Sequence, residues 1–495
     1  MRSDRFRTTT LRRSPGLGQR HVFASLVGLI LCGCADAAEP TRVDDPVPPV
    51  GRGDLVVGIR TVAGLPRLPD APDAAYANNA HARIQNLVPG RDGAGDFFVN
   101  DLRGVIYRVH RTADGTATVS PYFDVRSLGV HFTNEAHGNE SGLSGFAFHP
   151  DFNAKGKPGY GRLYVAFSTP SGSGTCDFVG DGNDSHESVV AEWTTTDPTA
   201  ATFTGTVREV LRVGQPGPTH NIGTIAFNPT VAPGDADYGQ LYISFGDGKG
   251  QHDPLRAGQR RGVPLGKILR LDPLPDAQHP RHRAPADNPF VGEPEAAPLV
   301  WAYGLRHPQH FGWDIGGTRR MFIAEMGQDQ IDEIDIGTRG GNYGWADREA
   351  TFATGMALNA RPGPVYERPP TDPTPMLYPV AQYDHDDGKA VGSVVVYRGK
   401  SIPALQGKLL CGDLMNGRIF YADEAELQQG RQTPLKELRL MVDGVEKGLS
   451  DVTTHGDPRG DRVDLRLGVD ADGEVYLLTK GDGKIRQLVP AASAK

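Results

Sequence analysis

One local pattern recurs along most of this chain and limits the folds open to it. It is a glycine-led turn, a strand of alternating aromatic and aliphatic residues, a second turn and another strand. The clearest copies are DFFVNDLRGVIYRV from Asp96, GRLYVAFS from Gly161, GQLYISFGDG from Gly239, RMFIAEMGQDQIDEIDI from Arg320, GKLLCGDLMNGRIFYAD from Gly407 and GEVYLLTKGDGKIRQL from Gly473. Period-two alternation with Asp-Gly, Asn-Gly or Arg-Gly between paired runs indicates β-hairpins. Six copies spaced roughly 65 to 90 residues apart predict an all-β fold, a six-bladed β-propeller with four-stranded antiparallel blades.

Composition and length agree with a fold of many short strands. The chain of 495 residues has 63 glycines and 39 prolines, about a fifth of its length, against an average of roughly 12 %. We expect one domain over residues 55–490, with the strand LVVGIRTVAG from Leu55 closing the ring by joining the last blade. Ser171 to Glu187 and Asp347 to Met376 are expected to be loops on one face.

The N-terminus is predicted to be an export signal over residues 1–34, followed by a disordered tether over 35–54. The apolar run from Val22 to Leu31 is too short to span a bilayer. Its ending LCGC is typical of a bacterial lipobox with Cys34 as the acylated residue, and cleavage near Ala35 is the alternative. The mature chain is therefore expected in the periplasm, touching a membrane only through such a lipid anchor.

The bulk charge and the cysteines exclude some functions. A net charge of −8 argues against a nucleic-acid partner, which normally shows as a basic excess, and favours a small ligand. Past the N-terminus only Cys176 and Cys411 remain, so neither a disulfide framework nor a thiolate zinc site is available. Whether these two cysteines pair is left open.

His220 and Asp247 are the first candidates for chemistry. His220, in PTHNIGTIAFNP, precedes a strand after a Pro-Gly-Pro loop, and an imidazole there is suited to act as a base near neutral pH. Asp247, in SFGDGKG, follows the next strand and is placed to hold the other imidazole nitrogen. The alternatives are a capping histidine and a turn aspartate.

Polar residues in two other stretches are candidate ligands. Glu140, in HGNESGLSGFAFHPDF, is suited to a polyhydroxyl substrate, or is a solvated loop carboxylate. Between Trp301 and Trp345, the planar groups of Arg306, His307 and Gln309 suit a carboxylate- or quinone-bearing ligand, unless Arg306 ties one blade to the next.

The turn that follows in the same stretch has the chemistry of a calcium site. Gly327 and Gln328 are predicted to expose backbone oxygens, with Glu333 as a nearby carboxylate.

Several motifs in a fixed order resemble one family. GLSGFAFHPDF, THNIGTIAFNP with GQLYISFGDG, PLGKILRLDP, YGLRHPQ, AEMGQDQIDEI and GGNYGW are similar to those of the glucose/sorbosone dehydrogenase family, over about Leu55 to Leu488. The resemblance implies a six-bladed propeller that oxidises an aldose sugar with the cofactor PQQ and Ca²⁺ and passes electrons to an external acceptor.

The resemblance also assigns roles. His220 would take the proton from the sugar C1 hydroxyl while hydride passes to C5 of the quinone, with Asp247 supporting the base, Glu140 in the sugar pocket and Arg306 facing the quinone oxygen. The cofactor contacts would come from Arg306, His307, Gln309, Gly327, Gln328, Asn416, Arg462 and Arg466, and the calcium ligands from Gly327, Gln328, Glu333 and Tyr343.

The chain departs from the family pattern in places. His307 stands where an asparagine is typical, and LMNGRIF puts Met415 and Asn416 where relatives supply a lysine to a PQQ carboxylate. Two other functions therefore stay open. One is a non-catalytic exported propeller that binds glycan or protein, and the other is a lactone hydrolase with a carboxylate-bound metal at the channel centre.

Overall fold

The computed structural model describes residues 39–68, 80–90, 95–112, 116–134, 140–180, 184–453 and 462–491. Contacts divide the chain into two units, Met1–Glu39 and Pro40–Lys495, and the architecture below is that of the second unit. The expected signal peptide and Cys34 lie outside the described residues. Within the described ranges, no helix is both long enough and apolar enough to cross a membrane.

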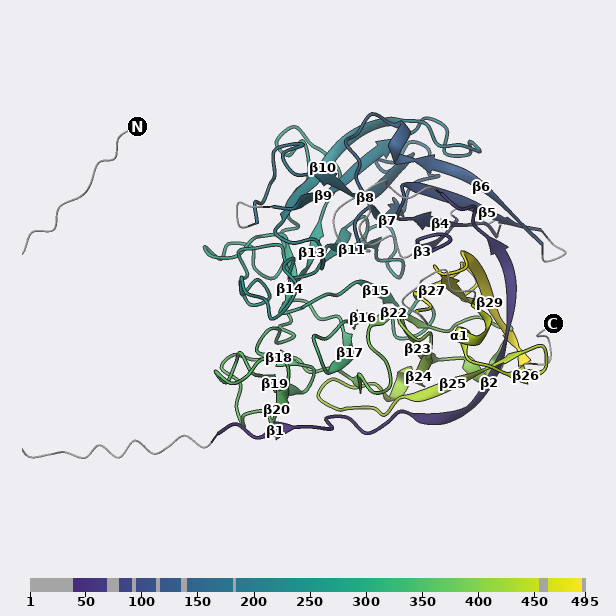
Figure 1. Ribbon diagram of the computed structural model, residues 1–495. Helices are drawn as coiled ribbons and strands as arrows, with labels where there is room; N and C mark the ends of the chain where they lie inside the picture. The colour runs from purple at the N-terminus through teal and green to yellow at the C-terminus, as the bar shows by residue number, and fades with distance from the viewer. Residues whose placement is uncertain are drawn as a thin grey trace, which may run out of the picture. The chain divides into compact units, whose positions relative to one another are not determined.

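Four separate antiparallel sheets have four strands each (Figure 1). They are β3 (Ile84–Pro89), β4 (Phe97–Asp101), β5 (Val105–Arg111) and β6 (Ala117–Asp124); β7 (Leu143–Phe148), β8 (Arg162–Pro170), β9 (His186–Thr194) and β10 (Thr206–Gln215); β11 (Ile222–Phe227), β12 (Leu241–Phe245), β13 (Lys267–Leu271) and β14 (Val300–Tyr303); β15 (His310–Trp313), β16 (Met321–Glu325), β17 (Ile331–Ile336) and β21 (Ala381–Asp384).

The N-terminal strand joins the two ends of the chain. A nine-stranded sheet contains β22 (Val391–Val396), β23 (Lys408–Asp413), β24 (Ile419–Asp423), β25 (Lys436–Val442), β2 (Gly51–Gly64), β29 (Lys484–Pro490), β28 (Val475–Thr479) and β27 (Leu465–Val469), with β26 (Val445–Glu446) paired to β25. β2 pairs antiparallel with β29 and parallel with β25. The expectation that the strand from Leu55 joins the last sheet is confirmed.

The first strands of successive sheets form a closed circuit of contacts. β3 contacts β7, β7 contacts β11, β11 contacts β15, β15 contacts β22, β22 contacts β27, and β27 contacts β3. Every copy of the sequence pattern falls on the second strand of one of these sheets, and four copies continue into the third. The fold is all-β, and its four-stranded antiparallel sheets are those of a propeller.

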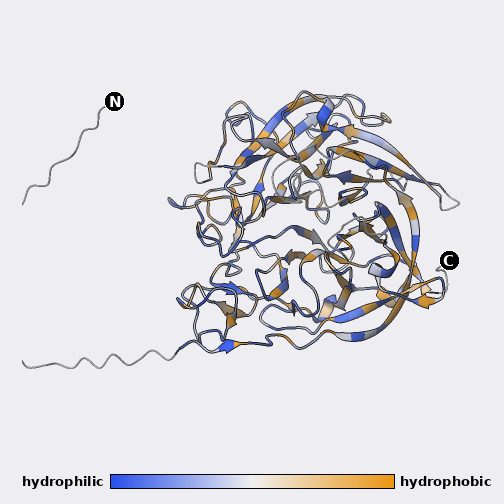
Figure 2. Cartoon of the chain, in the orientation of Figure 1, coloured by the Kyte–Doolittle hydropathy of each residue, from blue (hydrophilic) through white to orange (hydrophobic). Residues whose placement is uncertain are grey.

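Apolar side chains between neighbouring sheets hold the circuit together. One hydrophobic cluster lies between each pair of successive sheets, and Figure 2 shows the apolar residues distributed along the strands. Between the first two sheets, for example, the rings of Phe98 and Phe148 pack edge to face with centroids 4.9 Å apart. Such packing between faces fixes the sheets, while strand ends and loops remain available for polar chemistry.

Two segments expected to lack regular structure contain strands. In the range Asp347–Met376, β18 (Arg348–Glu349), β19 (Phe352–Thr354) and β20 (Val365–Tyr366) form a small sheet, and β1 (Arg42–Val43) of the expected tether pairs with β20. The tether is also fixed by burial of Val47. These very short strands were invisible to periodicity, because two residues cannot show an alternation. The one α-helix of the described residues, α1 (Leu449–Val452), is a single turn.

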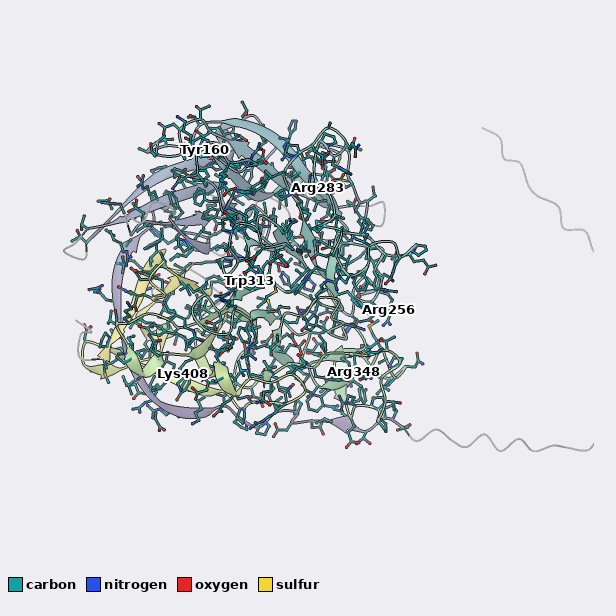
Figure 3. The ribbon with its side chains drawn as sticks, turned by 180° about the vertical axis from the view of Figure 1, so that it is seen from behind. Tyr160, Arg256, Arg283, Trp313, Arg348 and Lys408 are labelled. Atoms are coloured by element: carbon teal, nitrogen blue, oxygen red, sulfur yellow. The ribbon has the colours of Figure 1, made fainter. Side chains whose placement is uncertain are left out.

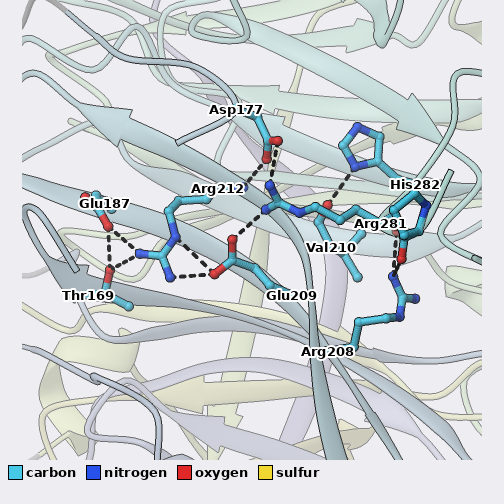
Figure 4. A network of polar contacts seen from close by, with 10 residues as sticks. Thr169, Asp177, Glu187, Arg208, Glu209, Val210, Arg212, Arg281 and His282 are labelled. Atoms are coloured by element: carbon cyan, nitrogen blue, oxygen red, sulfur yellow. Dashed lines mark hydrogen bonds and ion pairs between the residues drawn. The ribbon is translucent and has the colours of Figure 1, made fainter. Parts of the chain in front are cut away.

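The loop expected over Ser171–Glu187 is held by charged groups of β10 (Figure 4). Arg212 contacts Glu187 and Glu209 through its guanidinium, and its backbone N–H donates to Asp177 over 2.8 Å. Asp177 also accepts a bond of 2.7 Å from Arg281. The loop is therefore tied to two other segments of the chain at its centre.

Candidate functional site

The predicted site residues gather at one end of the innermost strands. Glu140 precedes β7, His220 precedes β11, Arg306 precedes β15 and Arg466 lies at the start of β27. Asp247 follows β12, a second strand. In an antiparallel sheet the start of the first strand and the end of the second lie at the same edge, so all five residues share that edge.

His220 and Asp247 form a buried pair. The Nδ1 of His220 lies 2.6 Å from Oδ1 of Asp247, whose Oδ2 accepts a bond of 2.9 Å from the indole N–H of Trp345. Burial raises the pKa of Asp247, but the contacts with His220 and Arg306 outweigh it and the pKa lies below its usual range. An ionised carboxylate accepts only, so Nδ1 carries the proton and Nε2 keeps a free lone pair. A base aimed away from Asp247 results.

The backbone around this pair requires close approach. His220 has φ of 58°, in the left-handed region. A Cβ at Gly246 would lie 2.6 Å from the backbone oxygen of His220, so only glycine fits there. The local strain at His220 is thus supported by the neighbouring strand end.

Glu140 and His307 complete one wall around His220. Oε2 of Glu140 accepts a bond of 2.6 Å from the backbone N–H of His220 and lies 3.6 Å from Nε2 of His307. The rings of His220 and His307 stack with centroids 4.9 Å apart and an angle of 26°. Burial opposes ionisation of Glu140, yet His307, His220 and the backbone N–H groups hold its pKa below the usual value. Glu140 is therefore a carboxylate at neutral pH.

Two buried imidazoles near this wall predict acid sensitivity. Burial lowers the pKa of His307 and of His186 from 6.5 to about 4. The unfolded chain then binds more protons between pH 6.5 and 4, so the stability is complete above pH 6.5 and is lost as pH falls through 4. At pH 4.5 each histidine should cost about 2 to 3 kcal/mol of the free energy of unfolding.

Urea unfolding at pH 7 and pH 4.5 measures this loss. His307→Asn should reduce the difference between the two pH values by about 2 kcal/mol. His279→Asn, which changes a half-exposed surface histidine, should leave it unchanged. An equal acid loss in wild type and His307→Asn would contradict the assignment.

Arg306 and Gln309 face other charged groups of the site. The guanidinium of Arg306 donates 3.2 Å to the carbonyl of Met326 and 3.3 Å to Oε1 of Gln328, and lies 5.7 Å over the ring of Trp345. The side-chain oxygen of Gln309 accepts a bond from Nη2 of Arg466. Arg306 is therefore held between the loop after β16 and the Trp345 side chain that also holds Asp247.

The loop after β16 is held by a residue that sequence reasoning missed. Oε1 of Glu349 accepts four backbone N–H bonds of 2.9 to 3.0 Å, from Gln328, Asp329, Gln330 and Ile331. The N–H of Gly327 donates 3.0 Å to Asp332. In the described part of the chain, no loop hydrogen bond is donated to the carbonyls of Gly327 and Gln328. These two oxygens are therefore free to bind a cation.

A cluster of buried carboxylates lies on the neighbouring strands. Glu325 of β16 is opposite Glu333 of β17, and Glu333 and Asp335 share one face of β17. Burial and their mutual repulsion raise the pKa of Glu333 well above its usual value, and burial raises that of Asp335. One oxygen of Glu333 and both oxygens of Asp335 have no hydrogen-bond partner among the described residues.

Such unpartnered buried oxygens suit a hard cation better than bare packing. Tyr343 is also buried, and its hydroxyl bonds to the backbone at Ile336 and Thr338. Within the described ranges, no group of three or more His, Cys, Asp or Glu side chains is arranged to hold a metal ion. A cation at Glu333 or at Gly327 would therefore depend on backbone oxygens as well.

Two predicted cofactor residues are engaged elsewhere. Asn416 donates 2.8 Å to the carbonyl of Asp387 and accepts from the N–H of Arg418, within its own turn. Arg462 pairs with Asp464. Cys176 and Cys411 are both free thiols.

The largest cavity formed by the inner strands lies at the opposite edge of the sheets. It has a volume of about 500 Å³ and is lined mostly by apolar residues of β3, β7, β11, β15, β22 and β27. Trp313, one of its residues, lies near the middle of the view from behind (Figure 3). The polar site and this cavity therefore occupy the two ends of the innermost strands.

Fold and site define an all-β propeller-type protein with a histidine–aspartate pair and buried arginines at one edge of its inner strands. A model of the family Glucose / Sorbosone dehydrogenase matches residues 91–487, and the chain belongs to that family. The HIPL1 protein of Arabidopsis thaliana is 28 % identical over 82 % of this chain and 61 % of its own length. The aldose sugar dehydrogenase YliI of Escherichia coli is 27 % identical over 51 % of this chain and 57 % of its own. The chain thus spans little more than half the length of these relatives.

A solved structure shows the same fold. The PQQ-bound aldose sugar dehydrogenase of Streptomyces coelicolor superposes with a TM-score of 0.52 and 21 % identity, covering 90 % of this chain and 99 % of that one.

Proposed function

We propose that this protein is a six-bladed propeller that oxidises an aldose sugar or related polyol with PQQ and Ca²⁺ and passes the electrons to an external acceptor. The observation that carries the proposal is the oriented pair of His220 and Asp247 beside the guanidinium of Arg306. Family membership supports it, and the closed circuit of six first strands supports the blade count.

The residues present fit the cofactor and the ion. Nη1 of Arg466 is buried with no hydrogen-bond partner among the described residues, which suits an anionic ligand. The carbonyls of Gly327 and Gln328 suit a calcium ion beside that ligand, and Glu333 with the backbone near Tyr343 suits another. PQQ, when bound, supplies the quinone that accepts hydride from the sugar C1.

The chain's own groups would do the proton and charge chemistry. Nε2 of His220 takes the proton of the C1 hydroxyl, and Asp247 holds the ring in the tautomer that leaves Nε2 free. Arg306 places a positive charge where negative charge develops. Glu140, an ionised acceptor beside His220, binds a sugar hydroxyl, and the proton moved to His220 returns to solvent after turnover.

The predicted export fits this chemistry. We propose that residues 1–34 direct the chain to the periplasm, with Cys34 as a lipid anchor, where sugars and an external electron acceptor are both accessible.

Reconstitution tests the proposal. Purified protein titrated with PQQ in the presence of CaCl₂ should acquire a bound quinone absorption spectrum and dye-linked oxidation of an aldose, and EGTA should lower both. Protein that never shows a bound quinone spectrum would overturn the proposal. Glycan binding without PQQ uptake would favour the non-catalytic propeller instead.

A further inference from the structure

Two buried cations lie together at the ends of β27 and β28, beside the His220 site. Leu465 pairs with Thr479 in the register of these strands, so Asp464 and Lys480 face each other one step beyond the last pair. Arg466 and Asp464 follow the same face of β27. Lys480 is 4 % exposed and Arg466 is 2 % exposed.

The positive charge at this point exceeds what the described side chains neutralise. Nη2 of Arg466 contacts the neutral amide of Gln309, and its Nη1 has no partner among the described residues. The carboxylate of Asp464 is engaged by Arg462. Within the described ranges, no hydrogen bond or ion pair joins the Nζ of Lys480 to an acceptor. Buried cations cost several kcal/mol unless an anion pairs with them.

The electrostatics of the two groups agree with missing negative charge. Burial lowers the pKa of Lys480 well below its usual value, and the charge of Arg466 lowers it further. Burial likewise lowers the pKa of Arg466 to about 10. A nearby anion would reverse both shifts.

The structure also leaves room at the end of the guanidinium. A Cβ at Gly392 of β22 would lie 2.6 Å from Nη1 of Arg466, so the glycine leaves this side of the arginine open. A carboxylate group is small, planar and matched to a guanidinium.

We propose that Arg466 and Lys480 together bind a carboxylate of the quinone cofactor, and that Lys480 supplies the ammonium group that residue 416 lacks. This assignment rests on the proposed function. Asn416 is bonded within its own turn and brings no charge. The cation comes instead from the end of β28, at the same edge of the sheets as His220.

Binding of PQQ to three variants tests the role of Lys480. Calorimetric titration in CaCl₂ should show PQQ affinity reduced about 30-fold or more by Lys480→Met and mostly restored in Lys480→Arg. Lys408→Met, which changes a lysine paired with Asp423, should bind as wild type does. Equal PQQ affinity in wild type and Lys480→Met would overturn the assignment and leave the proposed function standing.

The stability of the apo protein gives a second measurement. An uncompensated buried ammonium destabilises the empty site, so Lys480→Met should raise the apo Tm while weakening PQQ binding. A fall of several degrees in the apo Tm, or failure to fold, would show that Lys480 is paired within the protein and would overturn the assignment.

A probe without a quinone separates the two proposals. Pyridine-2,4,6-tricarboxylate carries carboxylates only, and its binding to wild type should also weaken in Lys480→Met. Lys480-dependent binding of this probe by protein that does not bind PQQ would keep the anion site and overturn the proposed function. Protein that binds neither compound would overturn both.

Discussion

Replacing His220 by glutamine should reduce kcat/KM for aldose oxidation about 10³-fold while PQQ remains bound. General bases contribute about 10² to 10⁴ to rate, and glutamine keeps the polar shape of the side chain without a basic nitrogen. Steady-state kinetics of the reconstituted variant, with the quinone spectrum as the measure of cofactor content, checks the loss. Because the backbone N–H of His220 and not its side chain binds Glu140, that contact should survive.

Two companion variants make this test specific. Asp247→Asn should lose a similar factor, because an amide that donates to Nδ1 would put the imidazole proton on Nε2. His279→Gln, at a half-exposed histidine paired with Asp276, should retain full activity. A His220→Gln enzyme with wild-type kcat/KM would remove the imidazole from the mechanism, and equal loss of bound PQQ would make it a binding residue.

Much of the fold was readable from local pattern because strands of one sheet are consecutive in sequence. Each Gly-led strand pair predicted from alternation became the second and third strands of a sheet, and His220 and Asp247 were placed by their positions at strand ends. Both sit directly beside β11 and β12, which are neighbours in one sheet. Proximity along the chain therefore carried that half of the site.

The rest of the site depends on contacts that no local pattern encodes. Trp345 reaches Asp247 across 98 positions, and Arg466 reaches Gln309 across 157. Lys480 looked like a turn residue of a Thr-Lys-Gly-Asp-Gly hairpin, since only the tertiary fold buries it. An aromatic residue or a lysine near a turn gives no signal until the neighbouring sheet is known.

The loop after β16 explains why one glutamate outside the catalytic pair should matter greatly. Gly327 and Gln328 are held in a turn whose next four N–H groups converge on Oε1 of Glu349. A Cβ at Gly327 would lie 1.6 Å from the carbonyl of Ile331, so the turn is also closely packed. Arg306 leans on this turn through Met326 and Gln328. The position of the guanidinium thus depends on the carboxylate of Glu349.

Glu349→Ala should therefore lower the free energy of unfolding by about 3 to 5 kcal/mol, because it leaves several donors without their acceptor. Glu349→Gln should lose only about 1 to 2 kcal/mol, since its neutral oxygen still accepts but without charge assistance. Urea unfolding measures both, and Glu367→Ala at an exposed glutamate is the control.

The same two variants should rank calcium-dependent PQQ affinity in the order wild type, Glu349→Gln, Glu349→Ala, because the turn that presents the carbonyls of Gly327 and Gln328 loosens in that order. Full PQQ affinity in a folded Glu349→Ala protein would show that the turn keeps its shape without the carboxylate. The cation would then have to be bound away from Gly327, with the buried oxygens of Glu333 and Asp335 as the remaining unpartnered acceptors on the adjacent strand.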